Sequence, residues 1–355
     1  QDTGEDVGFV RRGCLFTAGS DKEMRSFENW IAVAADHGIE SRLLSAAELK
    51  KLVPGSALKR AGAVYTESDG RAEPHKAAPA IARAAQRAGA TILTSCAVRG
   101  LETSGGAVSA VVTEHGTISA PTVLCAAGAW SSMFCRSLGV GVPQLKVRGT
   151  VARTAPCANV LEGNLFDERL GIRRRQDGGL TLAHGTVLQH PITPSTFRWG
   201  FKFIPALMQE LKVLRLSLGK EFFEEWRQPA TWDLDAVTPF EQNRVLNPEP
   251  SAKVLRGIRK NLDIMFPQLA DTPIVESWAG MVETSPDVVP MIGPVEGKPG
   301  FYIATGFSGH GFGLGPGAGK AIAGMLTNTD TGIDIAPLRL GRFFDGSPIK
   351  PQSTI

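Results

Sequence analysis

The segment TGFSGHGFGLGPGAGKAIAGML (residues 305–326) carries the residue pattern best suited to chemistry in this sequence. Seven glycines lie between residues 306 and 319, with one histidine, His310, among them. Glycines allow a ligand to approach the backbone, and a following helix N-terminus supplies free N–H groups and positive potential. The pattern predicts a loop that binds an anionic or electron-rich group. Close packing of a helix on a strand, which also requires glycine, is the alternative.

This loop does not match the common nucleotide-binding motifs. Neither the Walker sequence GxxxxGK[ST] nor the dinucleotide fingerprint GxGxxG occurs in the chain. The sequence therefore argues against an NAD-dependent dehydrogenase, and the C-terminal position of the glycines does so too.

Two apolar strands are expected to position the site. GFYIATG (300–306) predicts a strand that leads into the glycines, and TVLCAAG (122–128) predicts a second strand. The near-continuous apolar run of the second strand predicts burial on both faces in a parallel sheet. Such sheets hold ligands at the carboxyl ends of their strands, so we expect ligand contacts in the turn that follows, residues 126–131.

The rest of the chain is predicted to mix helices and strands. Capping boxes predict two helix starts, at Ser20 with Glu23 and at Ser45 with Glu48. A proline costs about 3 kcal/mol in a helix interior, so the helix that contains Pro79 is expected to begin near His75 or Lys76. Further strands are expected over 90–103, as two short strands around His115 and Gly116 within 106–121, and over 146–156, 170–185 and 197–203 (FRWGFKF); further helices are expected over 204–226 and 252–269.

Composition limits the class of protein. The 355 residues carry a formal net charge of +3, which gives no field suited to nucleic acid. The five cysteines show no metal-ligand spacing and are expected to be reduced packing residues, so no metal site is predicted. No apolar run approaches the roughly 18 residues of a membrane span. We expect a cytoplasmic protein of about two domains that binds a small molecule or another protein.

Four stretches together resemble the glycine/D-amino-acid oxidase (DAO) family of FAD-dependent amine oxidoreductases. They are ESDGRAEPHKAAPAIARAAQRAGA, VLCAAGAWS, ESWAGMVETSPDVVPMIGP and FYIATGFSGHGFGLGPGAGKAIAGML, in the family's order and spacing. The most similar branch holds D-amino-acid dehydrogenases, sarcosine oxidase β-like subunits and opine oxidase subunits. The resemblance spans about residues 9–330.

The resemblance implies an α/β fold with an α+β substrate domain, as in two-domain DAO-like flavoproteins. The FAD-binding-type domain is expected over 71–140 and 276–335, the substrate domain over 8–70 and 141–275, and a C-terminal tail over 336–355. Family members begin with a βαβ unit that bears GxGxxG, which this sequence lacks. We therefore expect a truncated or degenerate chain in which FAD binding is impaired.

The resemblance also implies which residues would line FAD. These residues are Val98 at the adenine, Ala127, Gly128 and Trp130 at the pyrophosphate and ribityl region, and Gly306, Gly309, His310, Gly311, Phe312 and Gly313 along the isoalloxazine. His310 is a candidate catalytic residue, although it could instead satisfy loop carbonyls. No cysteine follows Cys157, so the flavin is expected to be non-covalent.

The implied reaction is oxidation of a C–N bond in an amino acid or secondary amine. Hydride passes to flavin N5 and leaves an imine that water hydrolyses. The electron acceptor stays open between oxygen, a quinone and a partner subunit. The competing hypothesis is a cofactor-free chain that acts as a binding or structural subunit.

A substrate carboxylate is best held by an arginine, whose planar fork matches it. In the glycine-oxidase-like branch such an arginine follows the turn that corresponds to WAGM, where this sequence has Val282. That difference favours secondary amines such as opines, proline derivatives or N-alkyl amino acids. The candidate substrate-binding residues are Tyr65, Arg148, Arg173, Arg175 and Trp278, for each of which an ion pair or core packing is the alternative role.

Overall fold

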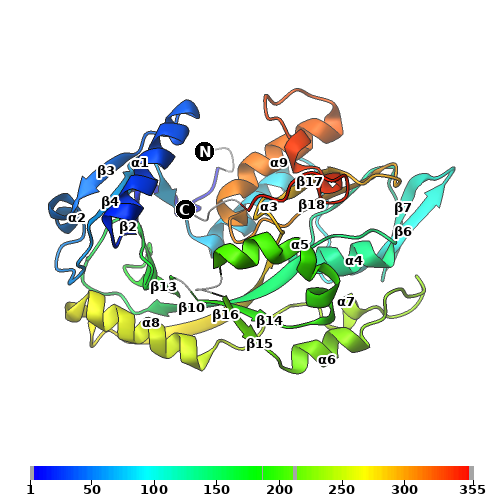
Figure 1. Cartoon of the computed structure of the whole chain (residues 1–355). Helices are drawn as coiled ribbons and strands as arrows, with labels where there is room; N and C mark the ends of the chain where they lie inside the picture. The colour runs from blue at the N-terminus through cyan, green and yellow to red at the C-terminus, as the bar shows by residue number, and fades with distance from the viewer. Residues whose placement is uncertain (1–3, 186, 211–213, 352–355) are drawn as a thin grey trace. The chain divides into compact units, whose positions relative to one another are not determined.

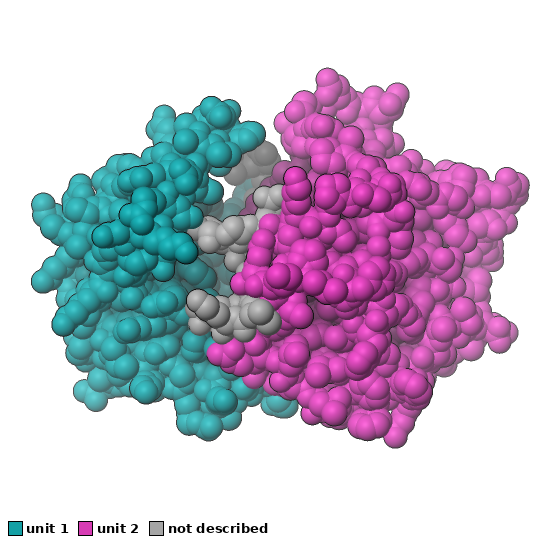
Figure 2. Space-filling view, viewed as in Figure 1, with its two compact units in different colours: residues 1–92, 149–187, 248–279 teal, residues 93–148, 188–247, 280–355 magenta. Residues whose placement is uncertain are grey.

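The computed structural model describes residues 4–185, 187–210 and 214–351 (Figure 1). They form two compact units, which Figure 2 colours separately. Unit 1 comprises residues 1–92, 149–187 and 248–279, and unit 2 comprises 93–148, 188–247 and 280–355. Two of the boundaries between the units, after residues 148 and 279, fall within strands β10 (Leu145–Thr154) and β16 (Ile274–Thr284).

Unit 1 is built on one sheet covered by helices. The strand order is β3-β4-β2-β11-β12-β13, followed by the unit 1 part of β10, and only the β2–β11 pair is parallel. The elements are β1 (Val10–Arg11), β2 (Cys14–Ala18), α1 (Asp21–Asp36), β3 (Arg42–Ser45), α2 (Ala46–Leu52), β4 (Gly62–Thr66), β5 (Gly70–Arg71), α3 (Pro74–Arg87), β11 (Asn164–Phe166), β12 (Leu170–Arg174), β13 (Leu180–His184), α8 (Ala252–Met265) and η2 (Pro267–Leu269).

The core of unit 1 follows from the spacing of apolar residues in α8. Val254, Ile258, Leu262 and Met265 recur every three or four residues, so they lie on one helical face. That face is buried in one cluster with apolar residues of the sheet such as Leu182. Figure 1 shows α8 lying along the sheet near β13.

The predicted helix starts are largely confirmed. Ser45 and Glu48 form a complete capping box, and the hydroxyl of Ser20 accepts a hydrogen bond from the N–H of Glu23. A complete box would also have the Glu23 carboxylate accept from the N–H of Ser20. That part of the prediction is wrong, because the carboxylate accepts from the N–H of Gly19 instead. Helix α3 begins at Pro74, close to the predicted start, and the missing N–H of Pro74 costs nothing there; Pro79, which was expected near the first turn, lies inside the helix.

Unit 2 contains two three-stranded sheets, β17-β18-β9 and β6-β7-β8, and a parallel pair of β14 with β15. The elements are β6 (Val98–Ser104), β7 (Ala107–Thr113), β8 (Gly116–Ser119), β9 (Val123–Cys125), η1 (Gly128–Trp130), α4 (Ser131–Ser137), β14 (Leu188–Pro191), α5 (Pro194–Glu210), β15 (Leu214–Ser217), α6 (Lys220–Arg227), α7 (Pro239–Gln242), β17 (Met291–Pro294), β18 (Phe301–Thr305), α9 (Gly311–Thr327), η3 (Ala336–Leu338) and η4 (Leu340–Phe343).

Three element predictions are wrong. FRWGFKF lies in helix α5, because aromatic residues that alternate along a strand, such as Phe197 and Phe201, are also spaced four apart as in a helix. Residues 214–217 form β15 where a helix was predicted, and residues 211–213 of that stretch lie outside the described residues. Residues 91–97 form no strand, since β6 begins only at Val98.

The compact units divide the chain differently from the predicted domains. Residues 188–247 group with unit 2, and the segment through α3 groups with unit 1. The functional domain division therefore remains a prediction. Within the described ranges, no helix is long and apolar enough to cross a membrane.

Candidate cofactor and substrate site

The carboxyl ends of β9 and β18 form the centre of the candidate site in unit 2. The two strands pair in parallel, with Cys125 opposite Ile303, so both end at the same edge of the sheet. Each is followed by a small-residue turn in which a glycine has positive φ, Gly128 at 54° and Gly306 at 76°. The geometry has the expected form of a ligand crevice at the carboxyl edge of an α/β sheet.

One buried glutamine joins the two turns. The side-chain N–H₂ of Gln144 donates to the hydroxyl of Thr305 at 2.9 Å and to the carbonyl of Gly128 at 3.1 Å. Its carbonyl oxygen accepts from the N–H of Ser132 at 3.1 Å. Gln144 and Thr305 are buried, so these bonds are shielded from water and fix the spacing of the turns.

Residues 285–289 also hold the glycine loop in place. The Ser308 hydroxyl accepts from the N–H of Ser285 at 3.2 Å and donates to the carbonyl of Gly306 at 3.0 Å. Asp287 accepts two hydrogen bonds from Arg342, at 2.8 and 3.0 Å, and both side chains are buried. The loop is therefore shaped by polar contacts within unit 2.

The glycines of the loop and the helix serve different purposes. A Cβ on Gly306 would lie 2.7 Å from Cε of Met291, so this position needs glycine for packing as well as for its φ. In α9 the situation is the opposite, because nothing described lies within 4 Å of the Cβ position of four helical glycines, namely Gly313, Gly315, Gly317 and Gly319. Close packing within the chain does not explain those four glycines. Because these glycines are spaced two residues apart, Gly313 and Gly317 leave one side of the helix bare, and Gly315 and Gly319 leave the roughly opposite side bare.

The first turn of α9 is uncapped. The helix begins at Gly311, and no side chain caps its N–H groups. His310 is exposed, and its imidazole makes no hydrogen bond within the described part of the chain. The phenyl ring of Phe312 is 53% exposed. This turn offers unpaired N–H groups, positive potential and apolar surface to a ligand.

A hollow of about 780 Å³ lies along β9 in the same unit. Predicted cofactor residues Val98, Ala127 and Trp130 line it, together with Phe240, whose ring meets that of Trp130 edge-on with centroids 5.6 Å apart. Because β9 faces this hollow, the prediction that it is buried on both faces is wrong: Val123 and Leu124 are half-buried, and Ala127 is exposed.

An ion pair borders the hollow. Arg244 lines it and donates to both carboxylate oxygens of Glu114 at 2.6 Å. These hydrogen bonds, with one from the N–H of Ala97, lower the pKa of Glu114 to about 2. No cluster of potential metal ligands occurs in the described ranges.

Two of the predicted substrate arginines are bound by carboxylates of unit 1. Arg173 pairs at 3.0 Å with Glu73, which is 1% exposed. Arg175 donates three hydrogen bonds to Asp177 at 2.9 to 3.1 Å. Both guanidinium groups therefore have partners within the chain.

The other three predicted substrate-binding residues differ in their partners and in their exposure to solvent. Arg148, in unit 2, donates to the side chain of Gln189 at 3.3 Å and has no carboxylate partner among the described residues. Tyr65 is half-buried, with the guanidinium carbon of Arg42 5.5 Å from its ring centre, and burial raises the pKa of its hydroxyl. Trp278 is 37% exposed.

Sequence reasoning missed one further cation in unit 1, Arg71. Its Nη1 is buried without a partner, its Nε donates to the carbonyl of Glu162 at 3.3 Å, and burial lowers its pKa. The signal was present, because Arg71 follows the turn in ESDGRAEP, one of the four stretches that carry the resemblance. Gln144 lies outside those stretches and carried no such signal.

Comparisons with known proteins agree with this geometry. The profile of the family described as "DAO: FAD dependent oxidoreductase" matches residues 1–325. Mitochondrial sarcosine dehydrogenase of Mus musculus is 26% identical over 97% of this chain and 33% of its own length, and D-amino acid dehydrogenase of Granulibacter bethesdensis is 23% identical over 96% and 70%. The structure of L-amino acid deaminase from Proteus myxofaciens superposes with a TM-score of 0.91 at 30% identity, covering 96% of this chain and 77% of that one. The chain spans about a third of the length of the sarcosine dehydrogenases that it matches.

Proposed function

Because the chain belongs to the DAO family of FAD-dependent oxidoreductases, we propose that it oxidises a C–N bond of a secondary amine or amino acid. The proposed substrates are N-alkyl amino acids, opines or proline derivatives, and the product is an imine that water hydrolyses. The observation that carries the proposal is the pair of small-residue turns at the ends of β9 and β18, next to the uncapped, bare start of α9.

The described residues of unit 2 fit FAD. The bare side of α9 at Gly313 and Gly317 suits a flat ring system, and the hollow along β9 suits a large, partly apolar group. We propose that Val98, Ala127, Gly128 and Trp130 hold one part of FAD, and that Gly306, Gly309, His310, Gly311, Phe312 and Gly313 hold another. When bound, FAD supplies an acceptor for the hydride of the amine-bearing carbon.

The chain contributes positioning and electrostatics to this reaction. The N–H groups at the start of α9 stabilise negative charge on a group beside them. Gln144 and Ser308 hold the two turns rigidly, so that little reorganisation accompanies binding. His310 is the proposed polar side chain at this helix end.

Val282 supports the choice of secondary amines. Its side chain would lie 3.8 Å from a Cβ on Gly309, so the residue beside the glycine loop is apolar and not an arginine. Sarcosine, named by a relative, is itself a secondary amine. Arg148, which has no carboxylate partner within the described ranges, is the proposed anchor for a substrate carboxylate.

The test is flavin binding followed by reduction. The purified chain, and a fusion in which a βαβ unit that bears GxGxxG is added at its N-terminus, are titrated with FAD and mixed without oxygen with sarcosine, N-methylalanine, proline, D-alanine and glycine. We expect the visible absorption of the oxidised flavin to bleach with the secondary amines first. Failure of both versions to bind FAD contradicts the proposal and favours a cofactor-free binding subunit.

Three finer expectations remain predictions. Weak FAD binding by the shorter chain follows from the absent GxGxxG, and the same titration checks it. A partner subunit as electron acceptor is checked by comparing oxygen, a quinone and co-purified protein as oxidants. Cytoplasmic location is checked by fractionation.

A further inference from the structure

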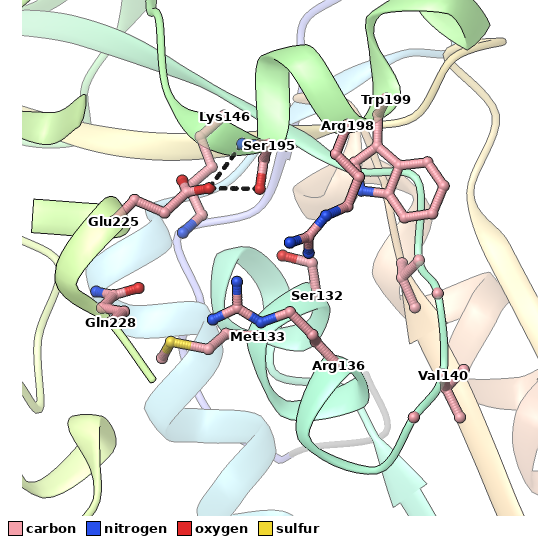
Figure 3. Close-up of a pocket in the computed structure, with 13 residues that line it drawn as sticks. Ser132, Met133, Arg136, Val140, Lys146, Ser195, Arg198, Trp199, Glu225 and Gln228 are labelled. Carbon is pink, nitrogen blue, oxygen red and sulfur yellow. Dashed lines mark hydrogen bonds between the residues drawn. The ribbon is translucent and has the colours of Figure 1, made fainter. Parts of the chain in front are cut away.

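A second cavity in unit 2, of about 270 Å³, is lined by α4, residues 139–142, the start of α5 and the end of α6 (Figure 3). It shares no lining residue with the hollow along β9. Its volume lies below the roughly 300–1,000 Å³ of pockets for drug-sized ligands, so it suits a small ligand.

The cavity is rich in positive charge. Arg136 on α4, Lys146 on β10 and Arg198 on α5 line it, and Figure 3 shows the ends of their side chains turned toward the same space. None of the three forms an ion pair with a carboxylate within the ranges that the structure describes.

Glu225 on α6 is the carboxylate that lines this cavity, and one of its oxygens already accepts hydrogen bonds within the chain. Its Oε1 accepts from the N–H of Ser195 at 2.8 Å and from the hydroxyl of Ser195 at 2.6 Å (Figure 3). Glu225 thereby holds α6 to the first turn of α5. Three cations face one carboxylate, which leaves the cavity with an excess of positive charge.

One donor atom of Arg136 has no hydrogen-bond acceptor among the described residues. Its Nη2 donates to the carbonyl of Pro229 at 3.0 Å, but its Nε is buried and has no partner. An unpaired buried donor is costly, and native proteins satisfy most of them. Burial and the charge of Arg198 lower the pKa of Arg136, and burial lowers that of Lys146, as expected where cations outnumber acceptors.

We propose that this cavity binds a small oxyanion with two negative charges, of the phosphate or dicarboxylate type. The three cations supply the charge, and the hydroxyl of Ser132 and the amide of Gln228 supply further hydrogen-bond donors. Trp199 and Met133 form apolar walls that limit the size of the ligand. The site is separate from the proposed flavin site and does not depend on FAD.

The cavity is nevertheless connected to the flavin-side turns. The backbone N–H of Ser132, a lining residue, donates to Gln144, which in turn donates to the carbonyl of Gly128. An anion bound against Ser132 therefore lies next to the network that fixes the turn after β9.

The test is calorimetric titration of the full chain, without flavin, with inorganic phosphate and separately with succinate. Sodium chloride keeps the ionic strength constant, because exposed charges bind any anion weakly at low salt. We expect saturable binding of at least one anion, with affinity lowered about tenfold by Arg198→Gln and by Arg136→Gln. Tighter binding of phosphate assigns a phosphate-type ligand, and tighter binding of succinate assigns a dicarboxylate.

Arg227→Gln is the matched control. Arg227 is an exposed arginine on α6 that does not line the cavity, so its loss should leave the affinity unchanged. Circular dichroism verifies that each variant is folded, and exposed Arg198 keeps the test valid if Arg136→Gln does not fold. No saturable binding of either anion, or equal binding by folded Arg198→Gln, overturns the proposal.

Discussion

Unit 2 contains two candidate binding regions that differ in which of their groups lack partners. The first, here called the strand edge, is the carboxyl ends of β9 and β18 with the turns at Gly128 and Gly306. The second is the basic cavity beside α4. At the strand edge, Gln144 and Thr305 are satisfied by partners within the chain, whereas the glycine surface of α9 is left open. In the cavity, apolar walls are formed by residues such as Trp199, whereas Nε of Arg136 lacks an acceptor and Lys146 and Arg198 lack a carboxylate partner among the described residues.

This difference indicates what each region binds. A region that satisfies its own polar groups and exposes bare backbone suits a flat, largely apolar group with a negative end. A region that packs its apolar groups and leaves cations unpaired suits a small anion. Variants that change either the strand edge or the cavity alone test this comparison.

The largest effect is expected from Asp287→Ala, which breaks the internal polar support of the strand edge. The change leaves Arg342 buried without its carboxylate, and removing one partner of a buried ion pair typically costs about 3–5 kcal/mol. Urea unfolding of both proteins measures the loss of free energy of unfolding. Asp345→Asn, in the exposed pair with Arg339, is the control and should change little. Equal losses of unfolding free energy for both variants would contradict the view that the buried Asp287–Arg342 pair supports this region.

The next effect is expected from Gly306→Ala. The φ of Gly306 is 76°, and the new methyl group would meet Met291, so we expect a loss of about 1–3 kcal/mol in the free energy of unfolding. Urea unfolding measures it. A wild-type stability for this variant would show that the loop relaxes freely and is not held by Ser308.

Gly313→Ala should act in the opposite direction on stability. Nothing described lies within 4 Å of the Cβ position, so the helix should gain about 0.5–1 kcal/mol from replacing glycine. If flavin lies against this surface, the same methyl group weakens FAD binding. Thermal unfolding and FAD titration of one preparation measure both effects, and unchanged FAD affinity would argue against the proposed contact at Gly313.

The strand-to-helix geometry of the site was predictable because its signals are local. An apolar strand, a turn that requires positive φ and a run of small residues lie consecutively in the chain, from GFYIATG into α9. The same holds for the Ser45 capping box, which spans four residues. The helix α5 was missed because one aromatic pattern fits both the strand and the helix period, so tertiary packing decides it.

The contacts that complete both regions were not predictable, because they join residues far apart in the sequence. Gln144 reaches Thr305 across 161 positions, and Asp287 reaches Arg342 across 55. Arg136, Lys146 and Arg198 come from three different elements, and nothing in their separate surroundings indicates a shared cavity. Glu73, the partner of Arg173, is likewise distant in the sequence, whereas Asp177 lies only two residues after Arg175 and could have been proposed as its partner.

A smaller effect is expected from acid, through the ion pair beside the hollow. The hydrogen bonds from Arg244 lower the pKa of Glu114 to about 2 from 4.5, so its contribution to stability is complete above the unfolded value. That contribution is lost as the pH falls from 4.5 toward 2. Melting temperatures of wild type and Glu114→Gln should therefore differ at pH 6 and converge at low pH. A constant difference would show that the charge of Glu114 is not the cause.

The smallest effect, Arg198→Gln, discriminates most directly between the two regions. Arg198 and Arg136 repel each other in the cavity, and Arg198 is exposed, so solvent screening leaves only about 0.5 kcal/mol or less to be gained when its charge is removed. In chloride the variant should be as stable as wild type or slightly more so. In phosphate or succinate the order should reverse, because the anion binds the wild type more tightly and therefore stabilises it more. Melting temperatures in matched salts measure this reversal. If Arg198→Gln is less stable than wild type in both salts, the guanidinium stabilises unit 2 by packing. That result would contradict the proposal that the cavity keeps unpaired cations in order to bind an anion.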